Sequence, residues 1–344
     1  MFHTISEIET CAKWWVDWEM LHNKTLLITG ATGLVGKYLL CVLLAHNRIY
    51  GGNMKFLAMG RNRQKFYQRF KEVEDIENVI FYEQDICDSI QINVPIDFII
   101  HLASNAHPRL YALEPIATEM TNILGTNNLL KLAAENKGCK ILFASSGDIY
   151  GDQTDHSSYL SEDDCGYINC NTLRAGYIEG KRAGEALCNA YKEERGVDFV
   201  IARLCRIYGF TMQIDDSKAI SQFILNAVKN EDIVLKSAGN QTFSYLYVFD
   251  VVTAILTILT KGVSGNAYNV ADNNQTVSLK ELAEMIAEIS HVKVIYGEED
   301  ALQKKGASSF QNVRLSSKKL LDLGWEPQFS MMEGLQRTIY ALRN

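Results

Sequence analysis

The chain has 344 residues and a formal net charge of -7 at pH 7, with 47% hydrophobic and 22% charged residues. This composition is typical of a globular protein, and the length suits two lobes or one large α/β unit. The acidic balance, without a run of Lys and Arg, argues against a nucleic-acid-binding surface. No apolar run reaches the roughly 18 residues that a membrane-spanning helix needs.

The predicted elements begin with an amphipathic helix over residues 5–21, where apolar residues recur at helical spacing. Strands and helices then alternate as far as about residue 205. The predicted strands cover 25–29, 55–59, 79–82, 98–102, 140–144 and 199–204, and the predicted helices 35–44, 116–134 and 177–195. This alternation predicts an α/β fold with a parallel, doubly wound sheet of the Rossmann type. Beyond residue 205, short helices mixed with short strands indicate a smaller C-terminal α/β lobe.

A glycine-rich loop follows the first predicted strand and opens the next helix. It contains Gly30, Gly33 and Gly36 in a GxxGxxG pattern, with Thr32 and the Leu34-Val35 pair between them. Glycines at these positions allow a tight turn and let backbone N–H groups approach a pyrophosphate at the helix N-terminus. The loop therefore predicts a dinucleotide cofactor.

The end of the second strand bears on the choice between NAD and NADP. An acidic residue there would accept hydrogen bonds from the ribose hydroxyls, but the chain has Arg61 after Gly60 instead. The missing acid and the Arg favour a 2′-phosphate and hence NADP; alternatively, Arg61 stacks on the adenine or is solvated. Asp85 and Ile86, after the third strand, are candidates to contact the adenine, although Asp85 can equally cap a turn.

Tyr177 and Lys181 lie four residues apart, so on a helix their side chains share one face. A phenol has an ordinary pKa of about 10, and a neighbouring ammonium lowers it. Such a pair forms a general acid/base that works near neutral pH. Because an exposed helix produces this spacing by chance, its meaning depends on the rest of the chain.

Several further segments accompany the loop and the Tyr/Lys pair. They are His101-Leu102-Ala103, Asn122–Thr126, Ser145–Gly151, Arg203 with Tyr208-Gly209, Tyr268-Asn269-Val270 and Leu323–Pro327. With them, the chain resembles from about residue 24 onward the extended short-chain dehydrogenases/reductases, and more narrowly the NAD-dependent epimerase/dehydratase group that acts on nucleotide sugars. The resemblance implies one tightly bound NAD or NADP per chain, with Leu102 and Ala103 beside it.

The resemblance also implies a domain division. Residues 1–23 form a helical extension, and residues 24–205 with about 243–262 form the dinucleotide-binding Rossmann domain. Residues 206–242 and 263–344 form the substrate-binding lobe. The family often dimerises through two long helices, here about 116–134 and 177–195, which predicts a homodimer.

The same resemblance assigns roles to the catalytic residues. Ser146 would hydrogen-bond the sugar hydroxyl, and Tyr177 would remove its proton while hydride leaves the sugar carbon, usually C4. Lys181 would lower the pKa of Tyr177 and hold the nicotinamide ribose. The 4-keto sugar can then be epimerised, dehydrated or decarboxylated before the hydride returns.

The stretch from Asn169 to Lys181, with Arg174 and Glu179-Gly180-Lys181-Arg182, resembles UDP-glucuronate decarboxylases. Asp148 stands where those enzymes carry a catalytic Glu. Gly147 replaces the first carboxylate of the pair that sugar 4,6-dehydratases use, which disfavours dehydration because expelling water needs both an acid and a base.

Two positions depart from the family pattern. Phe243 takes the place of the Arg that usually grips the nucleotide diphosphate, and Arg206 takes the place of an Asn after the sixth strand. One hypothesis is that Arg206 supplies the missing cation from the opposite wall; the alternative is that it pairs with a local acid. For a decarboxylase, Arg174 and Arg206 are the candidates to bind the substrate carboxylate.

The predicted function is therefore a nucleotide-sugar-modifying enzyme of the epimerase or decarboxylase type. The alternatives are an NADP-dependent reductase of a small carbonyl compound and a non-catalytic cofactor-sensing protein. Eight scattered cysteines without a CxxC or zinc-ligand spacing, and an acidic N-terminus without a signal-peptide pattern, predict a cytoplasmic location and no metal site.

Overall fold

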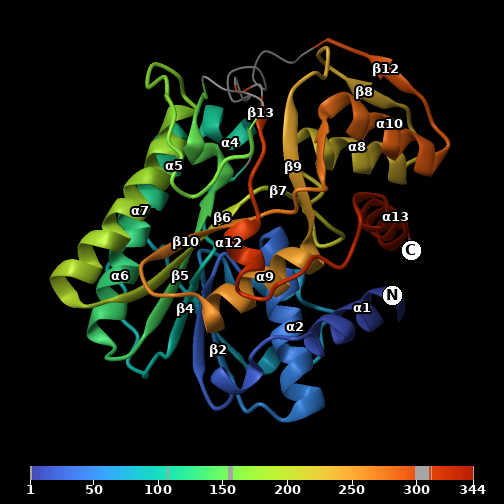
Figure 1. Ribbon diagram of the computed structural model, residues 1–344. Helices are drawn as coiled ribbons and strands as arrows, with labels where there is room; N and C mark the ends of the chain where they lie inside the picture. Colours follow the sequence, from blue (N-terminus) through green and yellow to red (C-terminus); the bar gives the residue numbers. More distant parts are fainter. Residues whose placement is uncertain (1, 107, 154–157, 299–309, 311, 344) are drawn as a thin grey trace.

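The computed structural model describes residues 2–106, 108–153, 158–298, 310 and 312–343 (Figure 1). A seven-stranded parallel sheet, in the order β10-β6-β5-β4-β1-β2-β3, forms its centre. These strands are β1 (Thr25–Thr29), β2 (Lys55–Gly60), β3 (Val79–Glu83), β4 (Phe98–His101), β5 (Lys140–Ser146), β6 (Asp198–Leu204) and β10 (Asn266–Val270). The predicted α/β class and the doubly wound parallel sheet are confirmed.

The sheet is buried on both faces because helices cover both. On one face lie α2 (Leu34–Tyr50) and α9 (Val248–Lys261), and on the other α6 (Thr126–Glu135) and α7 (Ala175–Arg195), as Figure 1 shows. Side chains such as Leu26 and Leu27, neighbours on one strand, point into different hydrophobic cores. This burial on both faces explains why the strands read as continuous aliphatic runs.

The predicted helix over residues 116–134 is divided in the structure. It consists of α5 (Pro115–Met120), a π-helical turn η3 (Thr121–Gly125) and α6. The Thr126 hydroxyl donates to the Asn122 carbonyl in the middle of this segment, and Gly125 lies so close to the Ile86 side chain that a Cβ there would overlap it. Local packing therefore interrupts a helix whose apolar periodicity looks continuous.

The predicted N-terminal helix is also shorter than expected. The helix observed is α1 (Phe2–Ala12), and a short 3-10 helix, η1 (Trp18–Met20), follows it. The remaining elements of the first half are α3 (Arg63–Arg69), η2 (Ile76–Asn78), α4 (Pro108–Leu113) and η4 (Gly147–Tyr150).

Within the described residues, the smaller lobe contains two short sheets and three main helices. One sheet joins β7 (Arg206–Tyr208), β9 (Thr242–Tyr247), β11 (Thr276–Ser278) and β13 (Asn312–Val313); the other pairs β8 (Ile233–Leu235) with β12 (Val294–Tyr296). The helices are α8 (Ala219–Val228), α10 (Leu279–Ser290) and α13 (Met331–Arg343), with the short α12 (Lys318–Leu321) before the last. A capping box between Ser278 and Glu281 fixes the start of α10.

Part of the division predicted from the sequence differs from this arrangement. Residues 263–344 were assigned to the smaller lobe, yet β10 pairs with β6 at the edge of the main sheet. The reason is that α9 crosses the sheet and returns the chain as one more parallel strand. The other boundaries of the division stay a prediction.

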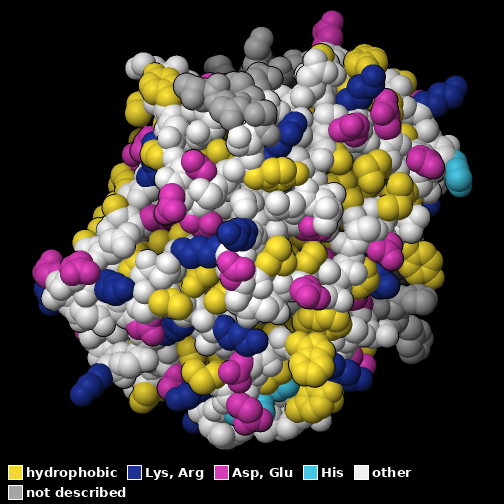
Figure 2. All heavy atoms as spheres, in the orientation of Figure 1, with side chains coloured by type: hydrophobic (Ala, Val, Ile, Leu, Met, Phe, Trp, Pro, Cys, Tyr) yellow, Lys and Arg dark blue, Asp and Glu magenta, His cyan; other side chains and the backbone are white. Residues whose placement is uncertain are grey.

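No helix in the described ranges is both long and apolar enough to cross a membrane, and no group of three or more potential metal ligands occurs in them. On the face shown in Figure 2, positively and negatively charged side chains are interspersed.

The N-terminal helix α1 joins the main sheet to the smaller lobe through one buried carboxylate. Glu7 accepts hydrogen bonds from the hydroxyls of Tyr38 at 3.0 Å and Tyr247 at 2.7 Å, and Arg337 lies 3.1 Å from its other oxygen. These three donors belong to α2, β9 and α13. The extension is therefore an integral part of the fold.

We predict that Glu7→Ala lowers the free energy of unfolding by about 2–4 kcal/mol, because two buried hydroxyls lose their acceptor. Urea denaturation at pH 7 measures this change. Glu9→Ala, on the same helix, is the control: Glu9 pairs with Arg48 at 3.2 Å near the surface, and its loss costs less than about 1 kcal/mol. Equal losses of unfolding free energy in the two variants would contradict the role given to Glu7.

Candidate active site

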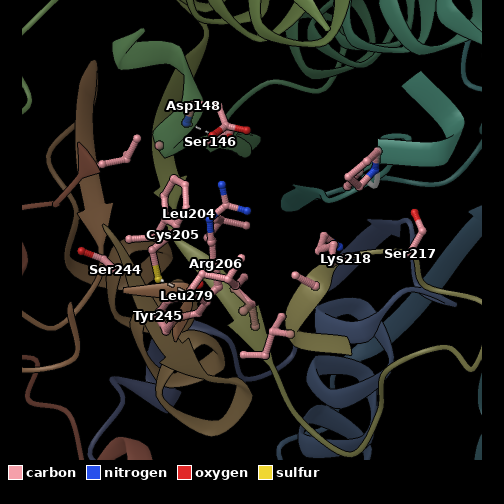
Figure 3. A pocket seen from close by; sticks show the side chains of 18 of the residues that line it. Ser146, Asp148, Leu204, Cys205, Arg206, Ser217, Lys218, Ser244, Tyr245 and Leu279 are labelled. Carbon is pink, nitrogen blue, oxygen red and sulfur yellow. Dashed lines mark hydrogen bonds between the residues drawn. The ribbon is translucent and has the colours of Figure 1, made fainter. Parts of the chain in front are cut away.

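A cavity of about 780 Å³ lies between the carboxyl ends of the central strands and the smaller lobe (Figure 3). Its walls include the glycine-rich loop, the end of β5 with η4, the start of β7, and the first turns of α8. The strand order reverses between β1 and β4, and in open parallel sheets ligands bind at such a switch point.

The glycine-rich loop fits a pyrophosphate by its backbone geometry. Gly30 has a φ of 70°, and a Cβ there would overlap the backbone of Leu102 and Ala103; a Cβ on Gly36 would overlap the Gly30 carbonyl. Gly33 is the N-cap of α2 and provides no side-chain cap, so the first N–H groups of a 17-residue helix remain available at the cavity. A loop of this shape at a helix N-terminus can bind the phosphates of a dinucleotide.

Residues predicted to bind the cofactor divide into two groups. Gly30, Gly33, Leu34, Val35, Gly36 and Leu102 line the cavity, whereas Thr32, Arg61, Asp85, Ile86 and Ala103 lie outside its lining. The Thr32 carbonyl instead accepts hydrogen bonds from Arg69 and Gln213. These bonds join the glycine loop to α3 and to the segment that follows β7, connections that no sequence motif indicated.

The Arg61 guanidinium is largely exposed and lies 3.9 Å from the Asp85 carboxylate. The other oxygen of Asp85 accepts the backbone N–H of Cys87 at 2.9 Å, so Asp85 caps a turn, as the alternative interpretation expected. The Asp85 carboxylate reduces the positive character of this end of β2.

Ser146 and Tyr177 meet at the closed end of the cavity. Ser146 ends β5 and accepts the N–H of Asp148 at 3.2 Å, while Tyr177 comes from the first turn of α7 and is hydrogen-bonded to the Ser146 side chain. The Tyr177 ring also stacks on Tyr111 of α4, with 4.7 Å between the ring centroids. Tyr111 lines the same cavity, but no motif in the sequence pointed to it.

The charge state of the Tyr/Lys pair differs from the sequence expectation. Burial, assisted by the Asp148 carboxylate, raises the pKa of Tyr177 to about 12, although the hydrogen bond with Ser146 lowers it. Burial lowers the pKa of Lys181 to about 7, and its Nζ donates to the Ala144 carbonyl at 2.6 Å. The Lys181 amine is therefore engaged with the backbone of β5, and burial dominates the acidity of Tyr177.

The buried Arg174 forms an ion pair with the half-buried Asp148, with 2.5 Å between their atoms. Burial opposes the charge of Arg174, but the Asp148 carboxylate raises the pKa of that guanidinium above its ordinary value. The Arg174 guanidinium also lies over the Tyr111 ring at 5.3 Å. Arg174 is thus committed to Asp148, which weakens its candidacy as the group that binds a substrate carboxylate.

Two neighbouring positions complete this end of the cavity. A Cβ on Gly147 would lie 2.9 Å from the Leu315 side chain, so the place of the first dehydratase carboxylate is occupied by an apolar residue. Asn169 lies outside the cavity lining, and its side chain accepts the N–H of Asn171 at 3.0 Å in a turn.

The two departures from the family pattern lie in direct contact. β7 pairs with β9 in a register that places Arg206 opposite Tyr245, and the Arg206 guanidinium lies 3.6 Å above the centroid of the Phe243 ring. The expectation that Arg206 stands on the opposite wall is therefore wrong, because strand pairing puts both residues on the same wall. Lys218 and Lys236, which the sequence analysis missed, also line the cavity.

Comparisons with known proteins agree with this fold. A family model described as "NAD dependent epimerase/dehydratase family" matches residues 26–271. UDP-glucuronic acid decarboxylase 1 of Danio rerio is 32% identical, over 92% of this chain and 72% of the relative, and UDP-glucuronic acid decarboxylase 6 of Arabidopsis thaliana is 31% identical, over 91% and 87%.

Solved structures with the same fold include UDP-glucose 4-epimerase of Thermotoga maritima, with a TM-score of 0.78 and 21% identity over 93% of this chain and 98% of that one. Another is dTDP-glucose 4,6-dehydratase of Streptomyces venezuelae with NAD bound, with a TM-score of 0.77 and 22% identity over 93% and 97%.

The buried Lys181 makes a prediction for the stability of the cofactor-free protein. The pKa of Lys181 is about 7 in the folded chain, against an ordinary value of 10.5 that applies to the unfolded chain. Between these pH values the unfolded chain binds a proton that the folded chain does not. Stability therefore rises with pH across this window, by up to about 1.4 kcal/mol per pH unit. Relative to Lys181→Met, the wild-type protein gains stability from pH 7 to pH 10 in urea denaturation. A constant difference between the two proteins would contradict the assigned pKa.

Proposed function

The chain belongs to the NAD-dependent epimerase/dehydratase family, and we propose that within it the protein is a decarboxylase acting on a nucleotide uronic acid of the UDP-glucuronate type. The curated relatives named above carry this activity in their names, and the chain covers most of their length. Such an enzyme modifies its sugar by transient oxidation at C4.

The observation that carries the proposal is the grouping of Ser146, Tyr177 and the Asp148–Arg174 pair at one end of the cavity. Two hydroxyls and a carboxylate lie together there, in the lining of the cavity. In contrast, Gly147 and Leu315 leave no carboxylate where 4,6-dehydration needs one. The grouping also argues against a cofactor-sensing protein, because such a protein has no use for a complete acid/base set.

In this proposal, Ser146 donates a hydrogen bond to the oxygen on C4, and Tyr177 receives the proton from that hydroxyl. A nicotinamide dinucleotide held by the glycine loop supplies reversible hydride transfer at C4. Oxidation makes the uronate a β-keto acid, so its C5–C6 bond breaks, CO2 leaves, and the electron pair moves onto the C4 oxygen as an enolate. The enolate takes up a proton at C5, and reversal of the hydride transfer restores the C4 hydroxyl of the resulting pentose. Because the pKa of Tyr177 is about 12 in the cofactor-free chain, Tyr177 accepts the proton of the C4 hydroxyl only after its own proton has left; the phenol then donates a hydrogen bond to the enolate oxygen.

We further propose that the cofactor is NAD rather than NADP. The sequence preference for NADP rested on Arg61, whose guanidinium is exposed and has Asp85 beside it. Arg63, two residues later, likewise lies 3.7 Å from the Glu83 carboxylate. Two acidic groups here disfavour a 2′-phosphate. The same observation removes the main support for an NADP-dependent reductase.

We also propose a cytoplasmic homodimer. All eight cysteines are free thiols, as a reducing compartment requires. On the helices predicted to form the interface, Ile116 of α5 is 76% exposed and Leu124 of η3 is 43% exposed, although both are large and apolar. A helical interface between two chains would cover these side chains.

The activity makes a direct prediction. Wild-type protein incubated with UDP-glucuronate and NAD releases CO2 and forms a UDP-pentose, both measurable by mass spectrometry. Tyr177→Phe lowers kcat by about 10²–10⁴-fold, because the proton acceptor is lost. Tyr191→Phe is the matched control, since it removes a hydroxyl further along α7 that contacts Asn127. Interconversion of UDP-glucuronate with its C4 epimer, without CO2, would replace the decarboxylase by an epimerase.

For the dimer, light scattering at micromolar concentration gives twice the mass of one chain. Ile116→Glu places a charge at the centre of the proposed interface and yields a monomer. Ile214→Glu, at a position that is 80% exposed in the smaller lobe, stays dimeric. A monomeric wild-type protein would refute this assembly.

A further inference from the structure

Arg174 and Arg206 line the cavity, and Arg182 and Arg203 lie on adjoining elements. Three of these four arginines have partners within the protein. Arg174 pairs with Asp148, Arg203 pairs with Glu185 at 2.8 Å, and Arg182 donates to the Ile149 and Gly166 carbonyls. Arg206 is different. Within the described residues, no carboxylate lies within ion-pair distance of its guanidinium, and no acceptor is hydrogen-bonded to it, although it lines the cavity.

The Arg206 side chain is held by a ring instead of by an acceptor. Phe243 is only 4% exposed, and on β9 it shares a face with Tyr245, the residue directly opposite Arg206. The guanidinium plane is thereby placed over the Phe243 ring at 3.6 Å. A ring face binds the cation without using its N–H groups, so the donors at its edge stay available.

The position of Arg206 links the lobe to the catalytic end of the cavity. In Figure 3, the residues of β7 lie below the turn that carries Ser146 and Asp148. Burial raises the pKa of Tyr111 well above its ordinary value, and Arg206 is one of the two arginines whose charge opposes that rise. The Arg206 charge therefore acts on the ring that stacks against Tyr177.

We propose that Arg206, laid on the Phe243 ring, is the anion-binding residue of the substrate pocket and holds an oxyanion of the nucleotide sugar. The oxyanion is a phosphate oxygen of the diphosphate or the carboxylate of the uronate, which present the same chemistry to a guanidinium. Phe243 is its positioning residue. The cation that related sequences carry on the equivalent of β9 is thus supplied by the adjacent strand β7. This inference rests on the proposed substrate class.

Isothermal titration of the NAD-loaded protein with UDP, UDP-glucose and UDP-glucuronate tests the assignment. Arg206→Ala weakens binding by about 10-fold to 100-fold, the range for a lost charge-assisted hydrogen bond, and leaves NAD affinity unchanged. A loss for all three ligands assigns the diphosphate; a loss for UDP-glucuronate alone assigns the carboxylate. Arg195→Ala is the matched control, because it removes an exposed guanidinium at the far end of α7.

Moving the guanidinium from β7 to β9 tests the role of Phe243. Arg206→Asn weakens binding as Arg206→Ala does, and adding Phe243→Arg to the same chain restores most of the affinity, because the guanidinium returns on β9. A double variant as weak as Arg206→Asn would overturn the shared role of the two positions. If Arg206→Ala melts at a lower temperature than wild type, the binding comparison is made instead with Arg206→Lys and the double variant, because both keep a cation.

The outcomes separate this inference from the proposed function. If wild type and Arg206→Ala bind all three ligands with equal affinity, the arginine assignment is overturned and the substrate class stands. If the wild-type protein binds none of them, both are overturned.

Discussion

The site depends on one close backbone contact, that of Gly30 with the peptide joining Leu102 and Ala103. Because no side chain separates the two segments, the loop after β1 crosses directly over the end of β4, and α2 starts at the edge of the sheet with its first N–H groups open. The reversal of strand order at the same point then sends neighbouring helices to different faces, which leaves a crevice between them. A side chain at Gly30 would move α2 away from the sheet and disrupt the phosphate-binding loop.

Around this frame, the chemistry is governed by burial of charge. Lys181 and Arg174 are withdrawn from water and Asp148 is half-buried, and each lies against a specific partner. Withdrawing a lysine amine in this way costs stability at neutral pH, whereas the ion pair fixes the turn after β5 beside Tyr177. At the catalytic end of the cavity, the Asp148–Arg174 pair and the Lys181–Ala144 hydrogen bond place these groups, whereas Arg206 lies on the Phe243 ring.

The sequence predicted the parts of this molecule that follow from periodicity and turn chemistry. The parallel sheet and the glycine loop lie where the pattern placed them, while β5 extends past its predicted end at residue 144 to include Ser146. It did not predict the π turn at Thr121–Gly125 or the return of β10 to the main sheet, because both depend on contacts with distant segments. Tyr111 had no motif, and the contact of Arg206 with Phe243 required the pairing of β7 with β9. The direction of the Tyr177 pKa shift depends on burial, which a four-residue spacing does not reveal.

The Glu7 carboxylate has a consequence for how the chain reaches its native state. Its donors are 31, 240 and 330 residues away along the sequence, so one carboxylate joins three segments that are distant in the chain. Such long-range closure is slow compared with local structure formation. The contacts of Glu7 are complete only when β9 and α13 are also in place. This carboxylate thus couples the main sheet to the smaller lobe.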